Sequence, residues 1–551
     1  MKLNLDHLLE SARRVTLLNA SSTMEVIVLN DVVDAETGEP IEISTAPLRG
    51  MNLVEAANFL FHHFAGDTAF VIRTPRSFAI VRPAFSELPI YYREREGRID
   101  LWSNREVPAA LLQSPLEFDL EYLSIAMHNW SWVTPRTGFQ SVSELLSGAI
   151  LIFDERELSQ RDLLVDSLLK LPMNQVHSYE QQVNTIRSLI LNSVRHKIGP
   201  YLDQGCIQCS GGLDSSIGAV AAAKLYPERK LPLIHCYSEL DPHGDERFYF
   251  NAVASHIGWP PSAVDMYQEA SQTDLSPHLL VPTVRPLKSS AALSTMATLK
   301  GLAMKKGARL MLSGDGGDQL FILNDPMVYC REVLKEATRP DIMLRTMSEL
   351  ASMGRETVWQ VAGEALHGSR AAQLRDRFFG EKRFPNNPLA ARAVPVGTEV
   401  VPNGLALAQL GVSRAFQYFG MRNAELNHIP VKGYPVEERK TFVFWPLIKK
   451  AITAQRSQHL KDGRDRAIER DAFRVELPGE VFSRFSKGGS RDFAERYDFD
   501  SLITSLQKGP LVRYGLVSEE IKNISGSRVD SDIAHALVVA QGVADWMELY
   551  A

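Results

Sequence analysis

The feature that most constrains this chain is an alternation of helical segments and short apolar runs between residues 179 and 312. Apolar side chains recur at helical spacing in residues 179–198, and further helices are predicted at 216–225, 246–257 and 289–306. The runs at 206–209, 233–237 and 308–312 are typical of buried strands. Strands that alternate with helices of this length predict a parallel α/β sheet.

The predicted secondary structure differs on the two sides of this region. Before residue 170, β-rich runs at 26–29, 69–72, 78–81, 90–92, 99–102 and 149–153 accompany one helix at 53–64. After about Arg331 the pattern is mostly helical, with a Pro- and Gly-rich interruption around 385–404. Because 551 residues are too many for one core, we expect two domains, 1–173 and 174–551.

Composition narrows the class of protein. With 45% hydrophobic and 23% charged residues, the chain is neither disordered nor fibrous. Its 60 Lys and Arg against 66 Asp and Glu give a net charge of −6, which argues against nucleic acid or an anionic membrane as partner. Four cysteines exclude a disulfide scaffold, and no apolar run reaches membrane-spanning length. We expect a cytoplasmic location.

The strongest motif is a glycine- and serine-rich turn between a predicted strand and a predicted helix. Its glycines let backbone N–H groups turn inward, and the positive end of the helix points at the same place. Such a turn predicts a cradle for pyrophosphate, with Asp214 placed to hold Mg²⁺ through oxygen. The turn consists of Ser210, Gly211, Gly212, Leu213, Asp214, Ser215 and Ser216.

A second motif follows the apolar run at 308–312, where open α/β sheets bind ligands. Ser313, Gly314 and Asp315 are predicted to contact the same nucleotide. Asp318 is predicted to complete the Mg²⁺ shell opposite Asp214. Cys206 and Cys209 have CxxC spacing, but on a strand they point to opposite faces, which disfavours zinc or redox chemistry.

Together the two motifs resemble the synthetase domain of the asparagine synthetase family, in which a pyrophosphate loop cleaves ATP between the α and β phosphates. Residues 64–70, 88–92 and 103–106 resemble the family's N-terminal amidohydrolase domain. The resemblance implies an Ntn-amidohydrolase-like α/β sandwich followed by a PP-loop, adenine nucleotide alpha hydrolase-like synthetase domain. It also implies ATP and Mg²⁺ as cofactors.

One departure from the family decides the branch. Glutamine-using members carry a nucleophilic cysteine directly after the initiator methionine, whereas this chain has Lys2 and no cysteine before Cys206. Without a thiol, residues 1–173 should be an inactive amidotransferase-like domain. The acceptor would then be an amine in the substrate itself, as in β-lactam and carbapenam synthetases and in lasso-peptide cyclases.

Three further residues are catalytic candidates on the same resemblance. Residues 485–489 look like the segment in which ring-closing synthetases carry a catalytic lysine, here Lys487. Residues 434–439 distantly resemble the family's Pro-Phe-Leu-Asp segment, but the glutamate expected before it is Val431. Tyr434 and Glu438 are therefore the catalytic candidates in this segment, with Glu425 as a further candidate for the general base.

The expected activity is ATP-dependent and AMP-forming. The enzyme would adenylate an Asp or Glu side chain of a precursor peptide and close it onto an internal amine as a macrolactam. The resemblance implies a leader-binding protein and a leader peptidase as partners. Alternatives are a β-lactam or carbapenam synthetase, an ammonia-dependent asparagine synthetase, a PP-loop RNA-modifying enzyme and a non-catalytic scaffold.

Overall fold

The computed structural model describes most of the chain. The residues described are 2–21, 23–95, 97–113, 116–128, 133–154, 157–172, 178–239, 241–242, 244–265, 277–287, 292–321, 326–336, 339–370, 372–373, 389–391, 404–407, 409, 411–484, 497–518, 521, 523–524, 529 and 531–550. The predicted boundary between residues 173 and 174 and the candidate Lys487 lie outside these residues.

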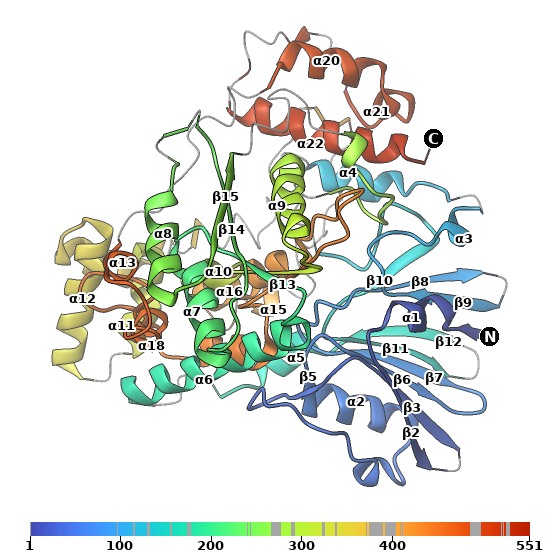
Figure 1. The fold of residues 1–551 in the computed structure, drawn as a ribbon, viewed down its shortest axis with the longest axis horizontal. Helices are drawn as coiled ribbons and strands as arrows, with labels where there is room; N and C mark the ends of the chain where they lie inside the picture. The colour runs from blue at the N-terminus through green and yellow to red at the C-terminus, as the bar shows by residue number, and fades with distance from the viewer. Residues whose placement is uncertain are drawn as a thin grey trace.

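The first part of the chain is a sandwich of two sheets (Figure 1). One sheet has the order β1 (Lys2–Asn4), β9 (Arg98–Trp102), β8 (Ile90–Arg95) and β10 (Val142–Leu145). The other has the order β12 (Glu157–Asp162), β11 (Ala149–Asp154), β7 (Phe78–Arg82), β6 (Ala69–Arg73), β3 (Met24–Leu29) and β2 (Val15–Ser21). A short pair, β4 (Val33–Asp34) and β5 (Phe64–Ala65), lies beside them.

Alternation along the strands builds this sandwich. On β7, Phe78 and Ile80 join the core between the sheets, whereas Ala79 and Val81 join a second core on the opposite face. Helix α2 (Leu53–His63) packs on that opposite face and begins with a capping box at Asn52. The shorter helices are α1 (Asp6–Ser11), α3 (Ala109–Leu112), α4 (Leu120–His128) and α5 (Leu164–Leu169).

The second sheet system is parallel throughout, with the strand order β15 (Pro261–Asp265), β14 (Leu233–Tyr237), β13 (Gly205–Gln208), β16 (Leu310–Ser313) and β17 (Glu437–Lys440). Helices α6 (Tyr179–Ile198), α7 (Leu213–Leu225) and α8 (Arg247–Ile257) cover one face, and α9 (Leu293–Lys305) covers the other. Cys206 and Cys209 lie in the cores of opposite faces, as expected. The predicted α/β fold is confirmed.

Strand β17 differs from the sequence expectation, which was helical for this part of the chain. Its four residues are Glu437, Glu438, Arg439 and Lys440, without one apolar side chain. Three of them are nevertheless buried. Ion pairs with the sandwich replace apolar packing here, because Arg439 contacts Asp67 at 2.5 Å.

Most of the remaining described elements are helices. They are α10 (Gly317–Phe321), α11 (Pro326–Glu336), α12 (Pro340–Gly354), α13 (Val358–His367), α15 (Gly404–Leu407), α16 (Val412–Leu426), α17 (Trp445–Thr453), α18 (Ala467–Ala472), α19 (Gly479–Ser483), α20 (Phe499–Lys508), α21 (Pro510–Arg513) and α22 (Ser531–Glu548). Helix α22 lies against α4, helices α20 and α21 pack on α22, and the three share a core with the sandwich (Figure 1). Within the described residues, no helix combines the length and apolarity needed to cross a membrane.

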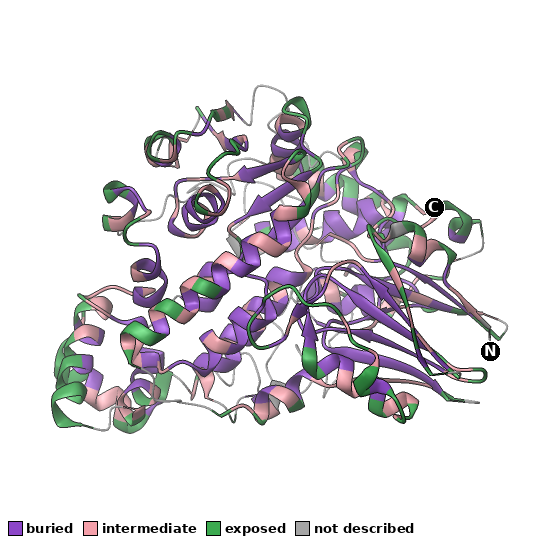
Figure 2. Ribbon diagram, turned by 60° about the horizontal axis from the view of Figure 1, so that its bottom comes forward, coloured by how far each residue is buried: buried purple, intermediate pink, exposed green. Residues whose placement is uncertain are grey.

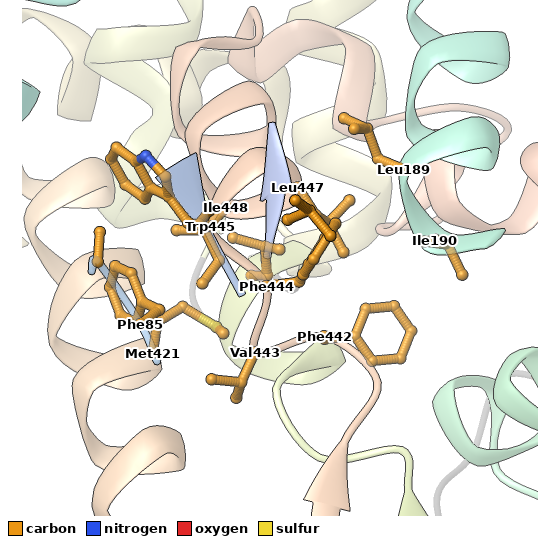
Figure 3. Close-up of a cluster of buried hydrophobic side chains, with 14 of the residues drawn as sticks. Phe85, Leu189, Ile190, Met421, Phe442, Val443, Phe444, Trp445, Leu447 and Ile448 are labelled. Carbon is orange, nitrogen blue, oxygen red and sulfur yellow. The ribbon is translucent and has the colours of Figure 1, made fainter. Parts of the chain in front are cut away.

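The sandwich and the parallel sheet share one continuous core (Figure 2). Phe85 leaves the sandwich and packs near Met421 of α16 and Trp445 of α17 (Figure 3). The rings of Phe85 and Trp445 stack with centroids 5.9 Å apart. Aromatic packing of this kind fixes the two sheet systems relative to each other, so residues from both can form one site.

Candidate active site

The glycine- and serine-rich turn follows β13 and leads into α7. Gly211 has φ +80°, and a Cβ atom there would lie 2.5 Å from the backbone nitrogen of Phe250. Glycine is therefore required by both conformation and space. The Ser215 hydroxyl accepts from the Ser210 amide at 3.1 Å, and the Ser210 hydroxyl accepts from the Gly212 amide at 3.2 Å. The two serines hold the turn in shape.

The second turn follows β16 and packs against the first one. A Cβ atom on Gly314 would collide with the backbone of Ser215, and one on Gly317 would lie 2.5 Å from Cγ of Asp214. The Asp318 amide donates to Oδ2 of Asp214 at 2.9 Å. Glycines in both turns thus allow the ends of the central strands to meet, as the sequence predicts.

Asp214 and Asp318 share one cation in the structure. Nη1 of Arg466 donates to Oδ1 of Asp214 at 2.6 Å and to Oδ1 of Asp318 at 2.7 Å. Burial opposes the charge on Arg466, but Asp214, Glu469 and Asp318 raise the pKa of the guanidinium above its usual value. A positive charge is therefore stabilised between the two carboxylates that the sequence assigns to Mg²⁺.

Glu469 lies next to this group, on the first turn of α18. It is fully buried, and neither carboxyl oxygen has a hydrogen-bond partner within the described part of the chain. Burial and the negative charges of Asp214 and Asp318 raise its pKa well above the usual value, so the protonated form is favoured. Sequence reasoning missed both Arg466 and Glu469, because the charged segment 461–470 has no motif that marks them.

We call the space enclosed by these turns the loop cleft, which has a volume of about 240 Å³. Its walls include most of the predicted nucleotide ligands, and the opposite wall carries Arg466, Arg470 and Arg484. Arg484 also pairs with Glu246 and lies 4.0 Å from the ring centroid of Tyr249. Three guanidinium groups beside a glycine-rich turn suit a polyphosphate. The predicted residues on the walls are Ser210, Gly212, Leu213, Asp214, Ser215, Gly314, Asp315 and Asp318.

The other candidates are placed at different points. Ser313 is buried, and its hydroxyl donates to Oε1 of Glu438 at 3.1 Å. Burial raises the pKa of Glu438, with Lys440 opposing and the charge of Asp315 adding to the rise. Tyr434 lies farther out, against Gly301 of α9. Glu425 is held by Arg82 and Arg422 in a buried ion-pair group, which gives it a structural role instead of a basic one.

Glu438 and Tyr434 border a second space, the interface cavity, which lies between the sandwich and the parallel sheet. Its volume is about 740 Å³. Glu438 thus faces the interface cavity while its neighbour Asp315 lines the loop cleft. Among the described residues, no group of three or more His, Cys, Asp or Glu side chains could hold a metal ion alone. A metal at Asp214 and Asp318 would need further oxygen ligands from phosphate or water.

Comparison with known proteins agrees with this geometry. The model of the asparagine synthase family matches residues 186–521, which is more than half of the chain. No curated protein matches the chain. The matched region begins in α6 and contains the parallel sheet and both turns of the loop cleft. Enzymes of this family use ATP to form carbon–nitrogen bonds. The chain belongs to the asparagine synthase family and is an ATP-dependent ligase of this general class.

Proposed function

We propose that this ligase closes a peptide into a macrolactam. The observation that carries the proposal is the pairing of a complete loop cleft with a first half that has no cysteine in residues 1–205. The first two cysteines, Cys206 and Cys209, are buried, and burial raises their pKa values to about 12 and about 11. Neither suits a glutamine-cleaving thiolate, so the amine would come from the substrate.

In this proposal the loop cleft binds ATP. Amides of the turn and the three arginines hold the phosphates, and Asp214 and Asp318 would hold Mg²⁺ together with phosphate oxygens. The metal, when bound, would offset negative charge on the pyrophosphate leaving group. A substrate carboxylate attacks the α-phosphorus and pyrophosphate departs. The amine nitrogen then attacks the acyl carbon and AMP departs.

Glu438 is the proposed acceptor of the amine's proton. Its raised pKa makes the carboxylate a stronger base than an ordinary glutamate, and the Ser313 hydroxyl holds one oxygen in place. Tyr434 would contact the substrate from the interface cavity. Lys487 remains a proposal from the sequence for the cation that stabilises the tetrahedral transition state. The proposal includes a precursor peptide, a leader-binding protein and a leader peptidase as partners.

The test uses leaderless peptides that are encoded next to the gene and have a free N-terminus and an internal Asp or Glu. With ATP and Mg²⁺, the product should lose the mass of one water, and AMP and pyrophosphate should form in equal amounts. Release of ADP and phosphate would contradict adenylation. Asparagine formation from aspartate and ammonia, or ring closure of a small β-amino acid, would select one of the alternative functions instead.

Asp214→Asn and Asp318→Asn probe the same step. Each should lower the rate of pyrophosphate release about 10²- to 10³-fold, the usual cost of one lost electrostatic contact to a transition state. Asp203→Asn is the matched control, since its side chain is 81% exposed and pairs only at the surface with Arg229. Equal rates for all three variants would remove both aspartates from the proposed site.

A further inference from the structure

The interface cavity has walls of balanced charge, contributed by both sheet systems. Its volume of about 740 Å³ lies within the roughly 300–1,000 Å³ of a typical small-molecule site. Its five carboxylates and five cations suit a ligand that carries both charges, such as the end of a peptide. They are Glu10, Glu87, Glu106, Glu437 and Glu438, with Arg13, Arg105, Lys300, Lys432 and Arg439.

Two buried polar atoms on these walls lack a hydrogen bond. Nε2 of His428 and Oε1 of Glu87 contact each other at 3.3 Å, and neither makes a hydrogen bond to the residues that the structure describes. Their side chains are 5% and 0% exposed. Buried polar atoms are normally bonded, so these two side chains depend on their mutual contact.

The inner end of the cavity is next to the loop cleft. Glu438 lines the cavity, and the Ser313 hydroxyl that binds it stands one residue before the Gly314 turn. Asp315 of that turn lines the loop cleft and acts on Glu438 through its charge. A group bound at Glu438 would therefore lie on the cavity side of the Gly314 turn, beside the loop cleft.

Lys300 of α9 stands on the same wall and is only 4% exposed. Its Nζ donates to the Ile429 carbonyl at 2.9 Å. Burial lowers the pKa of Lys300 to about 8, with Glu438 opposing, so the side chain is mostly protonated at neutral pH. The titratable and charged groups that act on it are Arg105, His428, Glu437, Glu438 and Lys440.

We propose that the interface cavity binds the amine-bearing end of the peptide substrate, and that Lys300 and Glu438 prepare this amine for attack. The inference rests on the proposed function, since it needs an activated carboxylate in the loop cleft. The ammonium of Lys300 disfavours a second cation beside it, so the substrate amine gives up its proton more readily. Glu438 takes that proton, and the nitrogen lone pair forms the bond to the acyl carbon as AMP departs.

Binding is tested without catalysis, through a thiol at the exposed cavity residue Asn104. In Asn104→Cys, triglycine should slow labelling by a maleimide, read by mass spectrometry. A peptide with a Kd near 1 mM, present at about 5 mM, would slow it about sixfold. N-acetyltriglycine should protect much less, because it lacks the amine. Ser505→Cys, exposed on α20 outside the cavity, and the parent chain are the controls. No protection at Asn104, or equal protection by both peptides, would overturn the proposal.

The chemical role of Lys300 is tested by pH profiles of ring closure with a peptide that the wild type cyclises. Lys300→Met should move the acid limb upward by about 0.5–1 pH unit, while Lys300→Arg keeps it near the wild-type position. If the acid limb of the pH profile stays unchanged in both variants, Lys300 does not have the proposed role. Pyrophosphate is measured in the same samples. If the wild type releases none, the proposed function is refuted. Labelling of Asn104→Cys does not depend on catalysis, so it still tests whether the interface cavity binds a peptide amine.

Discussion

The loop cleft and the interface cavity lie close together, yet they are built in opposite ways. The cleft is made mainly from two contiguous turns, where Gly211, Gly314 and Gly317 allow backbones to touch. The cavity is made from charged side chains of separate segments, such as Glu87, Lys300 and Arg439. A site that the backbone shapes can be predicted from a short sequence motif. A site that charges from distant segments shape can be recognised only in the folded structure.

The buried carboxyl groups near the interface cavity and near the loop cleft also differ, in their ionisation. Asp67, behind the cavity wall, contacts Lys197 at 3.3 Å and Arg439 at 2.5 Å. Burial alone would raise its pKa, but these cations lower it to about 2. Glu469, beside the cleft, has no hydrogen bond to either oxygen within the described residues, and burial raises its pKa. One carboxyl is held as an anion, and the other as an acid.

The largest expected effect is on the cavity side, in Asp67→Asn. Lys197 and Arg439 would keep Glu87 and Glu437 as partners but lose the carboxylate that they share. Removing one partner of a buried ion pair costs about 3–5 kcal/mol, and we expect a loss in this range at pH 7. A lowered pKa gives stability that is complete above the unfolded value of 3.8 and is lost as the pH falls toward about 2. The wild type and variant should therefore converge in urea unfolding between pH 4 and pH 2.

Asp203→Asn is the control for this comparison, since the exposed pair with Arg229 should change unfolding by less than about 0.5 kcal/mol. If Asp67→Asn and Asp203→Asn cost the same, the cavity wall does not depend on its ion pairs. The two sides of the molecule would then be built more alike than the contacts indicate.

The same contrast explains how much the sequence could predict. Helix α6 and the strand near 206–209 were predicted within a residue or so, because apolar spacing is local information. Both turns were found from their glycines and aspartates, and the structure brings Asp214 and Asp318 together. Helix α7 begins at Leu213, three residues before the prediction, because the turn itself supplies its first residues.

Strand β17 could not be predicted in this way. Glutamate and lysine, which make up three of its four residues, have low strand propensity. Arg439 and Lys440 pair with Asp67 and Glu87 in the first part of the chain, and the second of these pairs spans 353 residues. The contact of Arg466 with Asp214 and Asp318 could not be predicted for the same reason, because 148 residues separate Arg466 from Asp318. Long-range electrostatic pairing leaves no local pattern, so the interface cavity was not expected.

A smaller effect is expected on the cleft side, in Gly211→Ala. Both Gly211 and Gly258 have positive φ, of +80° and +68°, but only Gly211 has backbone atoms where a Cβ would lie. Gly258→Ala should cost about 1 kcal/mol from conformation alone. Gly211→Ala should cost about 1–3 kcal/mol more, because the backbone at Phe250 must move. Equal unfolding free energies for the two variants would show that close approach does not shape the turn.

The smallest effect on stability is expected in Glu469→Gln, and its dependence on pH is opposite in sign to that of Asp67→Asn. A carboxyl group with a raised folded pKa contributes stability below its unfolded pKa, near 4.5, and this contribution is lost as the pH rises toward the folded value. Glutamine keeps the shape of the protonated acid and cannot ionise. Between pH 5 and pH 6 the variant should therefore gain stability over the wild type, by at most about 1.4 kcal/mol. Denaturant unfolding across this range measures the gain, and Glu480→Gln, exposed on α19, should run parallel to the wild type. If Glu469→Gln also ran parallel, Glu469 would be ionised and paired in solution. The two sides of the molecule would then hold their carboxylates in the same way.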